Sequence, residues 1–200
     1  MENIVVLDLG GVLASETSQI RDVARRLGVR PDRASAVYWK FRDAWDAGCS
    51  DETYWRCVGE DLDLTVDDAT VAALTEHDIS LWTTPRPGAR AMLDALAESA
   101  NEVWLLSNAA ASFEPVLAAS DWGSRLTGRV ISGVEQLVKP EDAIYHLVES
   151  RSGHGGPELL YVDDRPENLV APRTMGWRTL LWKDDASTRA WLVDQGVLAS

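Results

Sequence analysis

Five short apolar runs, each of strand length, recur along the chain and set its fold class. They occupy residues 4–9, 103–107, 129–132, 159–163 and 179–182. The later runs are separated by residues 89–96, 140–150 and 165–175, where apolar side chains recur at the i, i+3, i+4 spacing of a helix. Strands that alternate with helices predict an α/β fold, a Rossmann-like doubly wound parallel sheet with right-handed crossovers.

One long gap interrupts this alternation. Residues 14–84 hold no good strand candidate, and their aromatic and apolar side chains, for example within residues 38–45, recur at helical spacing. The gap closes at the turn-rich segment 83–88 (TTPRPG). We therefore expect a small all-helical cap domain at residues 14–84, inserted after the first strand of a core formed by residues 1–13 and 85–200.

Charge and cysteine content narrow the range of partners. The 200 residues carry a net charge of −13, so nucleic acid and anionic membrane surfaces are not expected partners. Cys49 and Cys57 form neither a disulfide framework nor a CxxC pair, which favours free thiols in a reducing cytoplasm. No signal peptide or membrane-spanning run is apparent, and the oligomeric state stays open.

Polar side chains stand where the predicted strands end. They are Asp8, Ser107, Asn108, Asp163 and Asp164. A single aspartate in such a place is usually a loop or helix-capping residue. Three carboxylates that meet at one edge of a parallel sheet would repel one another unless a cation lies among them, and Mg²⁺ suits such oxygen ligands.

Four short motifs give the chain a specific resemblance. They are LDLGGVL (residues 7–13), LLSN (105–108), VKPEDAIY (138–145) and YVDDRPEN (161–168). In this order they resemble the haloacid dehalogenase-like hydrolase superfamily, in its capped phosphatase branch, and are similar to a bacterial α-glucose-1-phosphate phosphatase group. The resemblance spans nearly the whole chain.

The resemblance implies a role for each motif residue. Asp8 would attack phosphorus and form an aspartyl-phosphate, and Ser107 and Asn108, with nearby backbone N–H groups, would bind the phosphate of the substrate. Lys139 would pair with both the nucleophile and the phosphoryl group and neutralise charge during transfer.

The same resemblance implies a Mg²⁺ site. Its ligands would be Asp8, the backbone carbonyl of Gly10, and Asp164, with Asp163 as a further ligand or as support for one.

Gly10 is also the main departure from the family pattern. Most phosphatases of the superfamily carry a second aspartate there, which protonates the leaving oxygen and then activates water. Its loss predicts a slow enzyme, or one whose leaving group is relatively acidic, such as an anomeric hydroxyl. Glu16 is a candidate replacement acid.

The aromatic side chains of the insert have two interpretations. Together with two arginines they could line a sugar-phosphate pocket, or they could pack the insert's own core, which is the more frequent role of aromatic residues. These side chains are Tyr38, Trp39, Phe41, Trp45, Tyr54 and Trp55, with Arg42 and Arg56.

We expect a cytoplasmic Mg²⁺-dependent phosphatase that acts on a small phosphorylated metabolite, such as a sugar phosphate. One alternative is a 2-haloacid dehalogenase, which the acidic pair Asp163 and Asp164 argues against because the substrate is an anion. A second alternative is a catalytically weak phosphate-binding or regulatory protein, which the glycine at position 10 favours.

Overall fold

Five parallel strands form one sheet in the order β3-β2-β1-β4-β5 in the computed structural model, which describes residues 3–14, 19–99 and 101–199. The strands are β1 (Ile4–Leu7), β2 (Glu102–Ser107), β3 (Gly128–Ile131), β4 (Leu159–Asp163) and β5 (Arg178–Leu181). The central strand β1 pairs with β2 on one side and β4 on the other. The predicted fold class, a Rossmann-like parallel α/β sheet, is confirmed.

The fourth predicted strand matches β4 in full, whereas the other strands shift by one residue or more. The largest shift is in the first strand, which ends at Leu7 and not at residue 9. After Asp8, whose N–H donates to the carbonyl of Val162 (3.0 Å), the chain turns so that the N–H groups of Leu13 and Ala14 both donate to Leu9. The residues after β1 therefore form a loop at the carboxyl end of the sheet.

Alternate residues of each strand pack on opposite faces of the sheet. Val5 and Leu7 of β1 belong to one buried cluster, and Ile4 and Val6 belong to another. Both faces are covered, which explains why the strands are continuous apolar runs rather than alternating ones.

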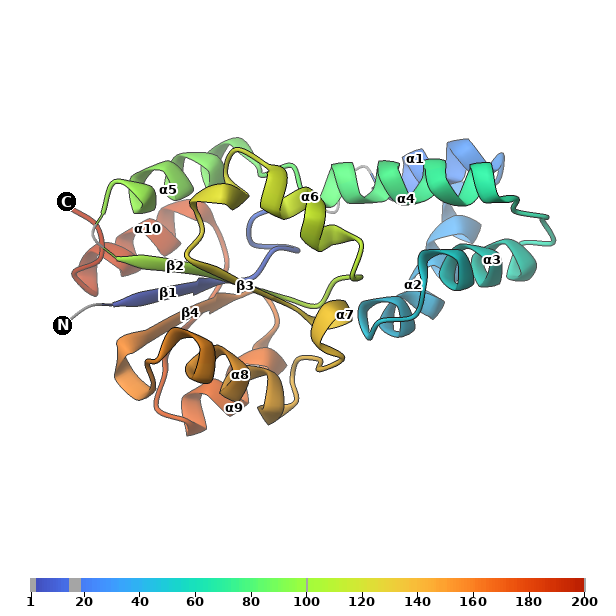
Figure 1. Cartoon of the computed structure of the whole chain (residues 1–200). Coiled ribbons are helices and arrows are strands. Elements are labelled where there is room, and N and C mark those ends of the chain that lie inside the picture. The colour runs from blue at the N-terminus through green and yellow to red at the C-terminus, as the bar shows by residue number, and fades with distance from the viewer. Residues whose placement is uncertain (1–2, 15–18, 100, 200) are drawn as a thin grey trace.

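Helices cover both faces (Figure 1). The face of Val5 packs against α5 (Pro87–Ala97), α6 (Phe113–Ala119) and α10 (Asp185–Asp194). The face of Val6 packs against α8 (Asp142–Ser152) and the region of α9 (Val170–Thr174). Short turns complete the connections: α7 (Ser132–Glu135) and the 3₁₀ helices η1 (Gly123–Arg125), η2 (Gly156–Glu158) and η3 (Pro166–Leu169).

The predicted single helix at residues 165–175 is wrong: the segment is η3 followed by α9. Pro172 has no N–H to donate to the carbonyl of Asn168 four residues earlier. The hydroxyl of Tyr145, from α8, donates to that carbonyl instead, at 2.8 Å. A tertiary hydrogen bond therefore replaces the helical one at the break.

Four helices lie in the described part of the segment between β1 and α5. They are α1 (Gln19–Leu27), α2 (Pro31–Asp46), α3 (Asp51–Asp61) and α4 (Asp68–Trp82). Side-chain caps fix two of the helix starts: Ser50 accepts from the N–H of Thr53, and Asp67 accepts from that of Thr70. We call α1–α4 the helical insert. The insert projects from the carboxyl end of the sheet, while the chain termini lie at the other end (Figure 1). The exact domain boundaries, 13/14 and 84/85, stay a prediction.

The aromatic side chains of the insert divide between the two expected roles. Tyr38, Trp45, Tyr54 and Trp55 are buried, and the rings of Trp45 and Tyr54 stack with centroids 4.2 Å apart. For these four residues the packing interpretation holds. Trp39 is 41% exposed and borders the pocket described below. Among the described residues, no helix is long and apolar enough to cross a membrane.

Candidate active site

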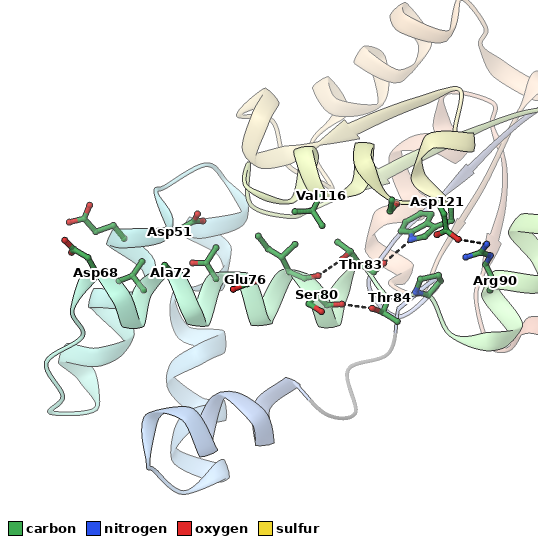
Figure 2. A pocket seen from close by; sticks show the side chains of 17 residues that line it. Asp51, Asp68, Ala72, Glu76, Ser80, Thr83, Thr84, Arg90, Val116 and Asp121 are labelled. Carbon is green, nitrogen blue, oxygen red and sulfur yellow. Dashed lines mark hydrogen bonds and ion pairs between the residues drawn. The ribbon is translucent and has the colours of Figure 1, made fainter.

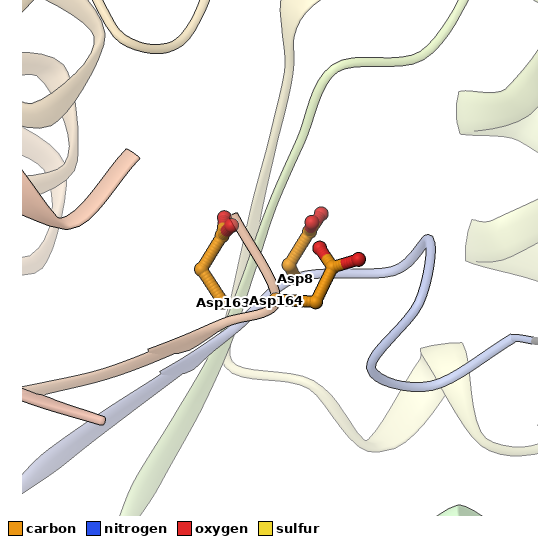
Figure 3. Close-up of side chains that lie close together, drawn as sticks. All are labelled: Asp8, Asp163 and Asp164. Atoms are coloured by element: carbon orange, nitrogen blue, oxygen red, sulfur yellow. The ribbon is translucent and has the colours of Figure 1, made fainter. Parts of the chain in front are cut away.

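Three carboxylates meet where β1 and β4 end (Figure 3). Asp8 follows β1 directly, Asp163 is the last residue of β4, and Asp164 follows it. Because the two strands are paired neighbours, a carboxylate oxygen of each residue lies within 4.8 Å of the others. The structure thus brings together the three acids that the sequence places at strand ends.

Lys139 places its ammonium group between two of these acids. Its Nζ lies 2.9 Å from Oδ1 of Asp8 and 2.8 Å from Oδ2 of Asp163, and it donates to the carbonyl of Leu106 at 3.2 Å. Burial lowers the pKa of this lysine, but the two nearby negative charges outweigh burial and raise its pKa. Lys139 therefore stays protonated. We call Lys139, Asp8, Asp163 and Asp164 the core cluster.

The carboxylate of Asp163 accepts hydrogen bonds from four protein groups. Besides Lys139, it accepts from the hydroxyl of Tyr161, the N–H of Arg165 (2.8 Å) and the side-chain amide of Asn168 (2.9 Å). Burial raises the pKa of Asp163, yet Lys139 and these donors lower it overall. Asp163 is fully buried, whereas Asp164 lines the pocket.

The carboxylate of Asp8 is destabilised in its ionised form by its surroundings. Burial is the main cause that raises its pKa to about 7; Lys139 opposes this, and the charges of Asp163 and Asp164 add to it. The core cluster holds three carboxylates and one ammonium group, so negative charge is in excess. A divalent cation beside Asp8 and Asp164 would balance this excess, and their hard oxygen atoms suit Mg²⁺.

Gly11 lets the loop approach Asp164 closely. Its φ of +76° lies in the left-handed region, and a Cβ at this position would lie 2.2 Å from Oδ2 of Asp164. Only glycine satisfies both conditions. The second glycine of the LDLGGVL motif is therefore explained by the packing of the loop against the acidic pair.

The two residues that end the β2 segment differ in their contacts. Ser107 is buried at the end of β2 and lines the pocket. The side chain of Asn108 binds the backbone of Lys139 at both ends: its Nδ2 donates to the carbonyl (3.0 Å) and its Oδ1 accepts from the N–H (2.9 Å). Asn108 thus positions Lys139. Contacts of Ser107 and Asn108 with a substrate stay predictions.

A pocket of about 610 Å³ lies between the strand ends and the helical insert. The core cluster contributes Asp8, Asp164 and Lys139 to its lining, and the loop contributes Gly10. The insert contributes a set of side chains from α2 and α4, namely Trp39, Arg42, Asp43, Asp46 and Trp82. Glu16, the candidate replacement acid, lies outside the described residues.

Sequence analysis missed a second charged cluster, which belongs to the insert. Arg42 donates from Nε to Asp46 at 2.7 Å, lies 3.4 Å from Asp78, and donates to the hydroxyl of Tyr38. Burial raises the pKa values of Asp46 and Asp78 to about 6, although Arg42 opposes this. We call Arg42, Asp46 and Asp78 the insert cluster. Only the i, i+4 spacing of Arg42 and Asp46 could have signalled it in the sequence.

Sequence analysis also assigned no role to Tyr161 or Asn168, which both hydrogen-bond Asp163. Their signal was present, because both lie within the YVDDRPEN motif, with Asn168 one turn of η3 beyond the acidic pair.

A second and larger cavity, of about 1120 Å³, lies between α4, the start of α3, and the α6–η1 region (Figure 2). Its lining mixes apolar side chains such as Val116 with acidic ones such as Glu76 and Asp121, the last paired with Arg90 at 2.8 Å. It shares no lining residue with the pocket at the strand ends. No residue of the core cluster reaches this cavity, so we place the chemistry in the smaller pocket.

Comparison with known proteins identifies the family. The model of the haloacid dehalogenase-like hydrolases matches residues 2–176, and the chain belongs to this family of hydrolases. The comparison with curated protein sequences gave no match.

Solved structures share the fold at low sequence identity. A haloacid dehalogenase family enzyme from Bacteroides thetaiotaomicron, Bt-2542, has a TM-score of 0.71 and 17% identity, over 94% of this chain and 98% of that one. Another structure of Bt-2542 is of its complex with magnesium and inorganic phosphate. L-2-haloacid dehalogenase from Xanthobacter autotrophicus has a TM-score of 0.67 and 21% identity, over 96% and 83% of the two chains.

Proposed function

We propose that this hydrolase is a Mg²⁺-dependent phosphatase that cleaves a small phosphorylated metabolite through an aspartyl-phosphate on Asp8. The observation that carries the proposal is the core cluster: three carboxylates within 4.8 Å of one another, with a buried lysine against two of them, at the floor of a pocket. Phosphoryl transfer requires a nucleophile and concentrated positive charge beside it.

The residues present fit a magnesium ion. Asp8, Asp164 and the backbone carbonyl of Gly10 would hold it, while Asp163, whose oxygens already accept from protein donors, would support the site from behind. When bound, Mg²⁺ supplies positive charge that offsets the charge of the phosphoryl oxygens.

The protein's own groups would supply the nucleophile, the positive charge and the hydrogen-bond donors for phosphoryl transfer. Asp8 presents a carboxylate oxygen to phosphorus, and the N–H of Leu9, which donates to Oδ1 at 2.7 Å, fixes its orientation. Lys139 neutralises charge on the nucleophile and on the phosphoryl group. Ser107 and the N–H groups that follow β2 would bind phosphoryl oxygens.

The pocket favours a polar, ring-shaped leaving group such as a sugar. Trp39 and Trp82 border it from the insert, and Arg42 lies beside them. Aromatic faces pack against sugar rings, and arginine donates to their hydroxyl groups. We place the reaction in the cytoplasm, where the free thiols of Cys49 and Cys57 are stable.

Dehalogenation of a 2-haloacid is the second candidate, favoured by the shared fold of the Xanthobacter autotrophicus dehalogenase. The excess negative charge of the core cluster opposes it, since the substrate would be an anion. A phosphate-binding protein without turnover is the third.

Release of p-nitrophenol from p-nitrophenyl phosphate tests the proposal, because this leaving group needs no acid catalyst. We expect turnover with Mg²⁺, none after chelation, and none for Asp8→Asn. Release of halide from 2-chloropropionate without metal would support the dehalogenase instead. Binding of inorganic phosphate with no turnover of either substrate would support the binding protein.

A further inference from the structure

Gly10 has no side chain that can donate a proton to the leaving oxygen. The indole ring of Trp82 fills the adjacent space: a Cβ on Gly10 would lie 3.3 Å from Cζ3 of Trp82. This ring comes from the last residue of α4 and is almost fully buried. A side chain at position 10 would therefore press against the insert, and a proton for an alkoxide leaving group must come from another residue.

The lining of the pocket limits the possible sources of that proton. The described residues contribute seven titratable side chains to it, of which three belong to the core cluster and two are arginines that stay protonated. The two that remain are the carboxyls of Asp43 and Asp46. Both lie on α2, on the same helix face as Trp39 and Arg42, because positions 39, 42, 43 and 46 have i, i+3, i+4, i+7 spacing.

Asp46 is the better placed of the two carboxyls. Asp43 is exposed to solvent, whereas the side chain of Asp46 is only 14% exposed and is held at 2.7 Å by Nε of Arg42. Arg42 is itself fixed by Tyr38 and Asp78. A carboxyl with such support keeps one orientation, which a proton donor requires.

Asp46 lines the same pocket as Asp8 and Lys139. Its backbone carbonyl accepts from the hydroxyl of Ser132 in α7, so the end of α2 is tied to the core. Burial raises the pKa of the Asp46 carboxyl to about 6, although Arg42 and, to a lesser extent, Lys139 oppose this. A group with a pKa in this range holds and releases a proton near neutral pH.

We infer that Asp46 of the helical insert donates the proton to the leaving oxygen, in place of the side chain that Gly10 lacks. The inference rests on the proposed phosphatase function and names the acid and base of that reaction. It also offers a replacement for the missing acid, whose loss led us to expect either a slow enzyme or one with a relatively acidic leaving group.

The two half-reactions balance with Asp46 as the only proton carrier. In the first, Asp8 forms a bond to phosphorus, the bond to the leaving oxygen breaks, and that oxygen takes the electron pair and the proton of Asp46. In the second, the carboxylate of Asp46 takes a proton from water as the water oxygen bonds to phosphorus. The bond between phosphorus and Asp8 then breaks, which restores both side chains and releases phosphate.

The test compares two leaving groups in Asp46→Asn, with Mg²⁺ present throughout. Asparagine keeps an oxygen that can accept from Arg42 but cannot deliver a proton. We expect kcat for glycerol phosphate, an alkyl ester, to fall by roughly 10²–10⁴-fold. The burst of p-nitrophenol from p-nitrophenyl phosphate should change by only a few-fold, because that leaving group needs no proton. Asp43→Asn removes the other candidate carboxyl, and we expect it to change the two rates by the same factor.

Three results would overturn the inference: equal losses for both esters, which would mark Asp46 as structural; no loss for either; or a selective loss of the alkyl ester in Asp43→Asn. The aryl burst also shows whether Asp46→Asn is folded. If the wild-type protein released no p-nitrophenol, the proposed function itself would fail, so the two failures are distinct.

Discussion

The core cluster and the insert cluster both place one cation against two carboxylates, yet they balance their charge differently. In the core cluster, Asp8 and Asp164 face a pocket. With Asp163 the cluster has three carboxylates against one ammonium group, so negative charge is in excess. In the insert cluster, Asp78 is sealed by packing, and the guanidinium of Arg42 lies over the ring of Trp45 at 5.1 Å. The open cluster can recruit a metal ion from solvent. Asp78 can take up only a proton, as its raised pKa indicates.

The largest effect should follow from Asp8→Asn. The substitution removes the proposed nucleophile but leaves Lys139 paired with Asp163 at 2.8 Å, so the fold should persist. We expect phosphatase turnover to fall by about 10⁴-fold or more. Measured rates on p-nitrophenyl phosphate, with circular dichroism as the control for folding, check this. Turnover within tenfold of wild type would remove Asp8 from the reaction.

Replacing Lys139 or Arg42, the cation of each cluster, should show that Mg²⁺ stabilises only the core cluster. Lys139→Met and Arg42→Met each leave buried carboxylates without their partner, which costs about 3–5 kcal/mol of unfolding free energy. Mg²⁺ should restore part of this loss in Lys139→Met, because the core cluster is open to a cation. It should restore none in Arg42→Met. Chemical denaturation with and without Mg²⁺ measures both, and equal recovery in the two variants would contradict the comparison.

Gly11→Ala should weaken the proposed metal site without replacing any of its ligands. A Cβ there would lie 2.2 Å from Oδ2 of Asp164, so that carboxylate must move. We expect Mg²⁺ affinity to fall by about 10–100-fold. Gly28→Ala is the matched control, since Gly28 has a similar φ of +68° but open space around it. Gly28→Ala should lose as much stability as Gly11→Ala but keep its affinity for Mg²⁺. Equal losses of Mg²⁺ affinity in the two variants would show that backbone strain alone is responsible.

The insert cluster should also make stability depend on pH. Burial raises the pKa of Asp78 from 3.8 to about 6, so the folded state binds a proton that the unfolded state releases. The stability from this group is full below pH 3.8 and is lost as pH rises through 6, at up to about 1.4 kcal/mol per pH unit. In Asp78→Asn, the midpoint of chemical denaturation should depend less on pH between pH 4 and 6 than it does in the wild-type protein. An unchanged slope would show that Asp78 is ionised throughout this range.

The sequence predicted the parts of the molecule that depend on local pattern. Apolar runs marked the strands, and the strand ends then placed Asp8 beside Asp163 and Asp164, because the carboxyl ends of parallel strands share one edge. The helical content of the insert was equally visible from its periodicity.

The sequence could not predict features that depend on contacts between distant segments. The break between η3 and α9 is stabilised by a hydroxyl from α8, and the insert cluster joins Arg42 to a residue 36 positions away. The contact of Trp82 with Gly10 depends on how the insert sits over the sheet. None of these pairs has a spacing that marks it in advance.

Calorimetric titration of Mg²⁺ into the wild-type protein, Asp164→Asn and Asp78→Asn tests the central claim, that the core cluster is built for a divalent cation and the insert cluster is not. We predict one bound Mg²⁺ per wild-type chain, at least a tenfold loss of affinity in Asp164→Asn, and unchanged affinity in Asp78→Asn. Wild-type affinity in Asp164→Asn, or no binding to the wild-type protein, would contradict it.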